Sequence, residues 1–278
     1  MQCAALAVAI AAPAQPGAPR SPSLDPARAA YLASMEGRKA DTLAAVQELA
    51  AKFPVEQVLA AGGSGWELAP QYAALVRFGL WDELVALMPP DSRAAGLTAG
   101  YLYGRGVALA ARGRLAEARV ALAELSALSA TVPADVLGVA LPVLAARIAA
   151  TELRNADAIT ALEQAIAAED RLAAGEASEW FFPVRHLLGA QLLAAGRAAE
   201  AEQVYREDLR RHPGNGWALF GLAAALRDEG RGRAAAAAER KFSRAWKSAD
   251  VRLVSSAFWF PGPDTTSCEC QRQPAGGW

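Results

Sequence analysis

The chain contains few of the residues that build metal sites, disulfide frameworks and acid–base centres. Its 278 residues include only 3 cysteines and 2 histidines. Cys268 and Cys270 would offer two soft ligands where a structural zinc needs four, and His186 and His212 lie too far apart in sequence to share a helical turn. We therefore expect no metal, no cofactor and no set of catalytic residues.

An excess of charge of either sign is also missing. The formal net charge is -1, which gives no general attraction to nucleic acid or to anionic lipid. Lysine and arginine do gather between Arg227 and Arg252. A solvated last helix whose cations complement its dipole explains them, and a phosphate or nucleic-acid surface is the alternative. We expect no nucleic-acid partner.

Long apolar runs are absent as well. The run from Val136 to Ala146 is shorter than the roughly 20 residues that a helix needs to cross a bilayer, and Pro142 interrupts it, so we expect no membrane insertion. Near the start, Ala4 to Ala12 precede an Ala-Pro-Ala sequence that resembles a signal-peptide cleavage site without the usual positive residues before it. Residues 1–24 are thus either a signal peptide of an exported, periplasmic protein or a disordered segment of a cytoplasmic one.

What the chain has in plenty is alanine and repetition. Apolar residues make up 53%, and their surplus is alanine, the best helix former. The phrase G-R-L-A-E-A at Gly113 to Ala118 returns as G-R-A-A-E-A at Gly196 to Ala201, and Gly196 is followed 34 residues later by Gly230. A 34-residue period filled by two helices is the tetratricopeptide signature. The sequence therefore predicts an all-α superhelix, a solenoid similar to tetratricopeptide arrays.

The repeats can be followed by the glycine expected at the turn between the two helices of each pair. A left-handed residue there lets the chain reverse, and glycine adopts that conformation without strain. The fourth copy has lost its glycine, and Leu153 stands at that position. The six turn positions are Gly37, Gly79, Gly113, Leu153, Gly196 and Gly230. We expect about six repeats over residues 25–253 and an irregular Pro/Gly-rich tail at 254–278.

The fifth repeat shows why such pairs must stack. Ala201, Val204, Tyr205 and Leu209 recur at the helical spacing of one buried stripe, while the charged residues between them face outward. A single pair of short helices cannot bury its own apolar face, so each pair depends on its neighbours.

Several segments resemble the C-terminal half of a family of bacterial tetratricopeptide-repeat proteins. They are Met35 to Arg38, Val76 to Glu83, Phe182 to His186 and Tyr205 to Trp217, and the likeness covers roughly Ala30 to Leu253. Members are typically longer, often exported, and carry a further helical half with histidine-rich motifs. The resemblance implies a helical repeat fold and no defined reaction, and this sequence would be a truncated member.

In such arrays the first helix of each pair lines the concave groove that binds a protein or peptide partner. Applied to this register, the groove is apolar and aromatic, and it lacks the lysine and asparagine clamp of chaperone-binding arrays. The predicted partner-binding residues are Tyr103, Trp180, Arg185, His186, Trp217, Phe220 and Arg227.

Two functions follow from these residues. The first is a non-catalytic scaffold that holds a partner in the concave groove. The alternative is an enzyme or a small-ligand-binding protein that uses the corner formed by Trp180, Arg185 and His186. A third interpretation makes the same aromatic residues part of the core between repeats. The sequence does not indicate the oligomeric state.

Overall fold

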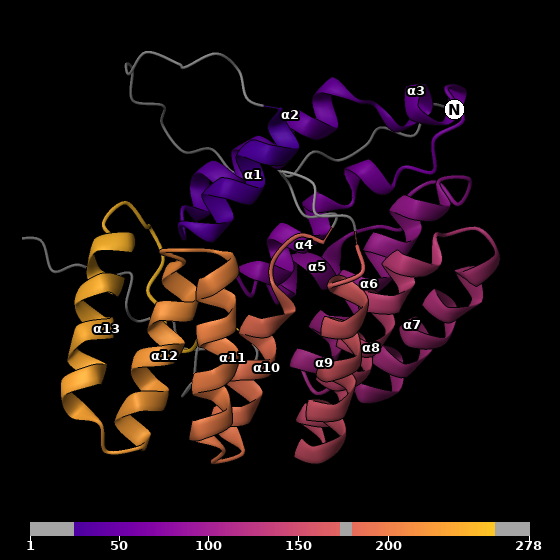
Figure 1. Cartoon of the computed structure of the whole chain (residues 1–278). Helices are drawn as coiled ribbons and strands as arrows, with labels where there is room; N and C mark the ends of the chain where they lie inside the picture. Colours follow the sequence, from indigo (N-terminus) through magenta and orange to yellow (C-terminus); the bar gives the residue numbers. More distant parts are fainter. Residues whose placement is uncertain (1–24, 173–179, 259–278) are drawn as a thin grey trace, which may run out of the picture.

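A computed structural model describes residues 25–172 and 180–258 of the chain. Within these residues the protein is all-helical, with thirteen α-helices, two short 3-10 helices and no strand (Figure 1). The predicted export segment at residues 1–24 and the tail that carries Cys268 and Cys270 lie outside the described residues.

Twelve of the α-helices form six consecutive pairs that pack against each other. The pairs are α1 (Pro26–Met35) with α2 (Lys39–Lys52), α4 (Pro70–Arg77) with α5 (Trp81–Ala86), α6 (Ala95–Ala111) with α7 (Leu115–Ala127), α8 (Ala134–Thr151) with α9 (Asn155–Glu169), α10 (Val184–Ala194) with α11 (Ala198–Arg211), and α12 (Gly216–Asp228) with α13 (Gly232–Ala245). Helix α3 (Val55–Ala60) and the 3-10 helices η1 (Trp66–Leu68) and η2 (Leu128–Ala130) lie in the connections.

Each pair turns at the position that the sequence predicted. All six turn residues have a positive φ, between 62° and 73°. Five of them are glycines, and the sixth is Leu153, which is the one non-glycine residue with a positive φ in the part of the chain described. Leu153 is 84% exposed, so its side chain packs against little. The turn therefore persists in the fourth pair although its glycine is lost, at the steric cost of a left-handed leucine.

Each pair also contacts the next along the chain (Figure 1), and hydrogen bonds join the first pairs to the last ones. The indole Nε1 of Trp217 in α12 donates to the carbonyl of Ser34 in α1 at 3.0 Å. Asp250, which follows α13, accepts a hydrogen bond from the backbone nitrogen of Ala40 in the first turn of α2 at 2.8 Å. Residues from 254 to 258 continue this closure, because Ser256 and Ala257 are buried. The inner faces of the two ends thus pack on each other.

Helix α8 corrects the expectation that Pro142 interrupts its apolar run. The helix continues through the proline for 18 residues. Helices α6, α7 and α9 pack against it, and we attribute its continuity to this packing, which outweighs the roughly 3 kcal/mol that an internal proline costs. By length and composition α8 could cross a membrane, but 61% of it is buried inside the protein, as in the core helix of a globular fold.

Close contact between the last pairs depends on a tyrosine seated between two glycines. Tyr205 in α11 is fully buried, and its ring lies against Gly189 in α10 and Gly221 in α12. A Cβ atom at Gly221 would lie 2.2 Å from a ring carbon of Tyr205, and one at Gly189 would lie 2.3 Å away. The three helices can approach this closely only because both glycines lack a side chain.

We expect Gly221→Ala to destabilise the protein although alanine is the better helix former. The added methyl group overpacks the Tyr205 ring, at a cost of about 1–3 kcal/mol that exceeds the gain of about 1 kcal/mol in helix propensity. The measurement is urea unfolding followed by circular dichroism. Gly232→Ala is the control, because nothing lies within 4 Å of its added Cβ, and it should leave stability unchanged or raise it. Equal stability of the two variants would contradict the packing described.

Candidate functional site

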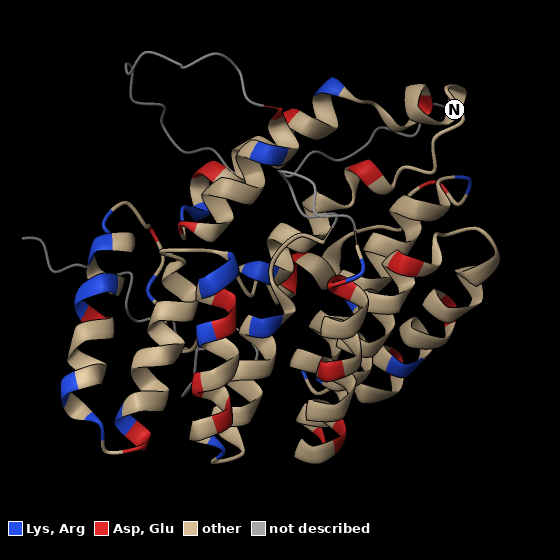
Figure 2. Ribbon diagram, in the orientation of Figure 1, with Lys and Arg blue, Asp and Glu red and all other residues tan. Residues whose placement is uncertain are grey.

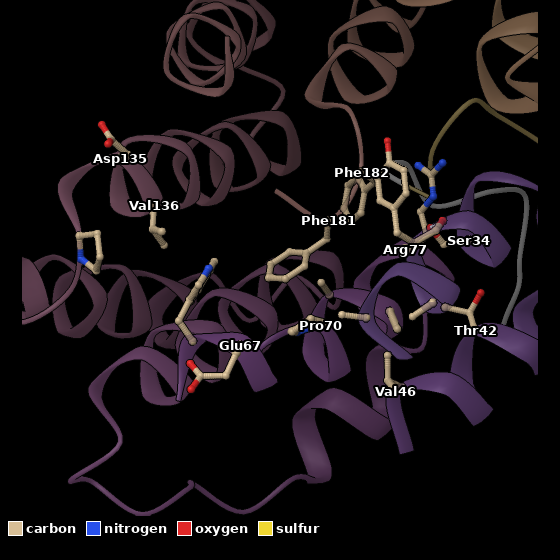
Figure 3. A pocket seen from close by; sticks show the side chains of 17 residues that line it. Ser34, Thr42, Val46, Glu67, Pro70, Arg77, Asp135, Val136, Phe181 and Phe182 are labelled. Carbon is tan, nitrogen blue, oxygen red and sulfur yellow. Dashed lines mark hydrogen bonds between the residues drawn. The ribbon is translucent and has the colours of Figure 1, made fainter. Parts of the chain in front are cut away.

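A hollow of about 380 Å³ opens where the first helices meet the middle of the chain (Figure 3). Its walls come from α1, α2, η1 and α4, from the start of α8, and from Phe181 and Phe182 ahead of α10. Most lining side chains are small or apolar: Ala27, Ala30, Val46, Trp66, Pro70, Ala73, Ala74, Pro133, Val136, Phe181 and Phe182. We call this hollow the α1–α4 groove.

The polar residues of the α1–α4 groove are divided between its two ends. Glu67 and Asp135 are exposed at one end, away from Ser34 and Arg77 at the other (Figure 3). Tyr31 and Thr42 complete the polar lining. The groove therefore has an apolar middle, an acidic outer end and a single cation at its inner end.

Arg77 is the buried charge at that inner end. Its side chain is 3% exposed, and its guanidinium carbon lies 3.7 Å from the ring centroid of Trp217 and 4.9 Å from that of Phe182. Such contacts with aromatic faces favour a cation that has lost its water. Burial lowers the pKa of Arg77 to about 9, with a partly opposing effect of Asp208. The guanidinium is therefore still charged at neutral pH.

A histidine connects Arg77 to a buried carboxylate. Arg77 Nη1 lies 3.0 Å from Nδ1 of His186, and His186 Nε2 lies 3.2 Å from Oδ2 of Asp208. Because a guanidinium can only donate, Nδ1 accepts, and the neutral ring carries its proton on Nε2. The acceptor at Nε2 is Asp208, while Nδ2 of Asn215 also lies 2.6 Å from this nitrogen. Asp208 also accepts from Nδ2 of Asn215 at 2.9 Å, and its Oδ1 lies 3.1 Å from Nδ1 of His212.

The electrostatics keep this network in one protonation state. Burial lowers the pKa of His186, so the ring stays neutral. Burial alone would raise the pKa of Asp208, but the hydrogen bonds that its carboxylate receives from His186 and His212 outweigh burial and hold that pKa well below the ordinary range. A charged Asp208 thus balances the charged Arg77 across a neutral imidazole.

Neighbouring hydrogen bonds tie the network to five parts of the chain. Asn215 caps α12 by accepting from the backbone nitrogen of Trp217 at 3.0 Å. Ser256 donates to the carbonyl of His186 at 3.0 Å and lies 2.6 Å from the hydroxyl of Tyr205. The buried polar groups therefore join α4, α10, α11, α12 and the segment after α13.

The entry to α10 is held by a second charged cluster. Both carboxylate oxygens of Glu169 lie 3.2 Å from the backbone nitrogen of Val184, and Arg185 donates to both oxygens of Asp170 at 2.9 and 2.7 Å. Burial raises the pKa of Glu169 to about 7, although the hydrogen bond from Val184 and the charge of Arg185 oppose this. Glu169 therefore changes its charge near neutral pH.

Five of the seven predicted partner-binding residues are buried, which contradicts their placement on an open surface. Tyr103 is 1% exposed, Trp180, His186 and Trp217 are 0% exposed and Arg185 is 7% exposed. The physical reason is packing against other parts of the chain. Trp217 packs on Phe78 in the closure described above, and Trp180 packs on Trp66 and Tyr103.

The two remaining predicted residues lie on the outside of the last pair. Phe220 is half-buried with its ring 5.4 Å from that of Phe242, and Arg227 is exposed and pairs with Glu239 at 2.8 Å. Neither lines the α1–α4 groove. Half of the basic cluster near the C-terminus, four of its eight residues, lies on the exposed face of α13 (Figure 2).

The predicted corner of Trp180, Arg185 and His186 is not assembled as one site. Trp180 contacts other aromatic rings, Arg185 pairs with Asp170, and His186 lies between Arg77 and Asp208. Each side chain enters a different environment.

Sequence reasoning missed Arg77 and Asp208, although both left a signal. Arg77 is the only charged residue in the run from Tyr72 to Trp81, so a helix that buries this run must bury a charge. Asp208 lies three residues after Tyr205 on the stripe that was predicted to be buried. A carboxylate on a buried stripe requires a partner, and a buried arginine elsewhere in the chain is the natural one.

A second hollow, of about 430 Å³, lies between α11, α12 and α13. Leucines including Leu222 and Leu226 form its floor, and Arg206, Arg210 and Lys241 stand at its rim. Arg206 pairs with Glu202 and Arg210 with Glu207, so both arginines are already compensated by carboxylates on α11. We therefore take the α1–α4 groove as the candidate site.

Comparison with protein-family models found no family that matches this chain, and comparison with curated proteins found no significant match.

We expect Asp208→Asn to cost about 3–5 kcal/mol of unfolding free energy, because it leaves the buried Arg77 charge uncompensated and sets amide donors against His186 and Asn215. Urea unfolding at neutral pH measures this. The control Asp228→Asn, at the exposed end of α12, should stay within about 0.5 kcal/mol of the parent. If Asp208→Asn cost no more unfolding free energy than Asp228→Asn, the network would not be essential for stability.

Glu169→Gln should change the pH dependence of stability. The folded pKa of about 7 lies above the ordinary 4.5, so the contribution of Glu169 is present below pH 4.5 and is lost as the pH rises through about 7. Glutamine removes the charge and keeps an acceptor for Val184. The unfolding free energy of the variant should therefore exceed that of the parent by roughly 1–3 kcal/mol at pH 8 and differ little from it at pH 5.

Unfolding midpoints at these two pH values test this expectation. Glu163→Gln on the exposed face of α9 is the matched control and should show the same difference at both. A pH-independent effect of Glu169→Gln would contradict the raised pKa.

Proposed function

We propose that this protein is a non-catalytic scaffold, a helical array similar to tetratricopeptide repeats, which binds an apolar segment of a protein or peptide partner in the α1–α4 groove. Six helix pairs that turn at left-handed residues and contact one another in series support the array. The resemblance to bacterial repeat proteins agrees with this interpretation.

The observation that carries the proposal is the apolar hollow itself. About 380 Å³ of open space lies beside a well-packed core, and most of its lining is apolar. Its volume lies in the lower part of the range of ligand sites, and its walls are small and aromatic side chains, as is usual for such sites. An extended segment with small apolar residues fits these walls.

The α1–α4 groove replaces the inner face of the array as the binding surface. In this chain the inner faces of the two ends pack on each other, so Trp217 and His186 serve the fold. The groove lies at the edge of that closure, where Phe181 remains half-buried and the alanines of α1 and α4 leave room.

We favour binding over catalysis because the histidine of the predicted corner is fully buried and its ring is held on both sides. His186 faces Arg77 with one ring nitrogen and Asp208 with the other. A general base needs a free nitrogen that reaches a substrate proton.

A photo-crosslinker placed in the groove tests the proposal. With p-benzoylphenylalanine at Phe181, we expect a covalent adduct with a distinct partner in cells that express the protein, because the ring would contact the bound segment. The same residue at Met88, which is 82% exposed and does not line the groove, is the control. The same adducts from both positions, or none from position 181, would reject the groove as a partner-binding surface.

A further inference from the structure

The guanidinium of Arg77 has one edge without a protein acceptor. Nη1 faces His186, and the two aromatic rings lie against the group. Among the described residues, Nε has no hydrogen-bond partner, and the contact found for Nη2 is the thioether sulfur of Met35 at 4.0 Å. Sulfur is a weak acceptor, and a methionine side chain moves readily. Nε is therefore a buried donor without a partner, and Nη2 has only the weak sulfur acceptor of Met35.

These two donors form a fork that matches a carboxylate. The N–H groups on Nε and Nη2 of arginine are parallel and can bind both oxygens of one carboxylate. Arg77 lines the α1–α4 groove together with Tyr31 and Ser34. Asp208 acts on the opposite side of the guanidinium, through His186, and so does not fill this edge. Burial raises the pKa of Tyr31, so its hydroxyl keeps the proton that it could donate to an anion.

We propose that the inner end of the α1–α4 groove is an anion subsite, and that the groove binds a small monocarboxylic acid whose apolar body lies along the alanines of α1 and α4. This goes beyond partner binding, since such an acid would occupy the same space as a peptide and exclude it. The protein would then couple the presence of the acid to release of its partner.

The charges of the groove define which acid fits. The carboxylate belongs at Arg77, and the body extends past Ala73, Ala74 and Phe181 toward the outer end. Glu67 and Asp135 stand exposed at that end, where they repel a second negative charge. A linear monoanion therefore fits, whereas a dicarboxylate of the same length does not.

Calorimetric titration of the purified protein with octanoate at neutral pH tests the proposal, with three probes of the same length: octanol, octylamine and octanedioate. We expect octanoate to bind with one-to-one stoichiometry and at least about tenfold more tightly than each of the others, because only octanoate gains the charge-assisted fork without repulsion. Equal affinity for octanoate and octanol, or no binding of octanoate, would overturn the anion subsite.

Variants locate the binding. Arg77→Lys keeps the charge but loses the paired donors, and should weaken the binding of octanoate about tenfold or more. A second variant, Ala74→Leu, keeps the test valid if Arg77→Lys does not fold. It narrows the groove and should weaken the binding of octanoate, whereas the exposed control Ala127→Leu should not. Undiminished binding by Ala74→Leu would place the acid elsewhere and overturn the assignment.

Titration with a peptide distinguishes a small-acid site from the proposed peptide-binding scaffold. An acetylated Ala-Val-Leu peptide with a free C-terminal carboxylate should bind more weakly than octanoate, and tighter binding of that peptide would overturn a small acid as the occupant. Octanoate should also suppress the adduct formed from position 181. Binding of octanoate without any adduct from position 181 would reject the scaffold and leave the acid site standing.

Discussion

The structure depends on how one buried positive charge is balanced. Arg77 cannot leave water without a counter-charge, and the nearest described carboxylate in its network is Asp208, reached through the ring of His186. These three residues lie on three different helices, so the balance exists only when α4, α10 and α11 come together. An array of pairs that touch only their neighbours would leave Arg77 exposed or uncompensated. The electrostatic requirement therefore selects a closed arrangement over an open one.

Closure has a direct consequence for the surface. Two aromatic residues that would line an open concave face are used in packing: Trp217 packs between the two ends, and Trp180 packs against Tyr103 in α6. Their burial contributes more to stability than an exposed groove could, because each large aromatic side chain removes much apolar area from water. The space left for a ligand is then a smaller one at the rim of the closure. We propose that binding occurs at this rim and not on the inner face.

Local sequence signals predicted the local structure well. The turn positions required only a left-handed residue between two helical stripes, and even Leu153 was found because its neighbours keep the pattern. Contacts between distant pairs were not predictable in this way, because a 34-residue repeat does not specify which non-neighbouring pairs pack against each other. The predicted break at Pro142 was wrong for the same reason, since packing along the whole of α8 outweighs a local preference. Burial of His186 likewise depends on a partner far away in the chain, Arg77.

The choice of polar groups at the centre also bears on specificity. A buried ion pair is often no more stabilising than apolar residues of the same volume, so its presence calls for another reason. Here Arg77, His186 and Asp208 can satisfy each other in a single arrangement, and any other docking of the two ends would bury unpaired charge. The network thus makes one closure strongly preferred. That arrangement leaves Nε of Arg77 without a partner, and Arg77 also lines the α1–α4 groove. The residue that organises the fold is therefore also the one that we propose recognises an anion.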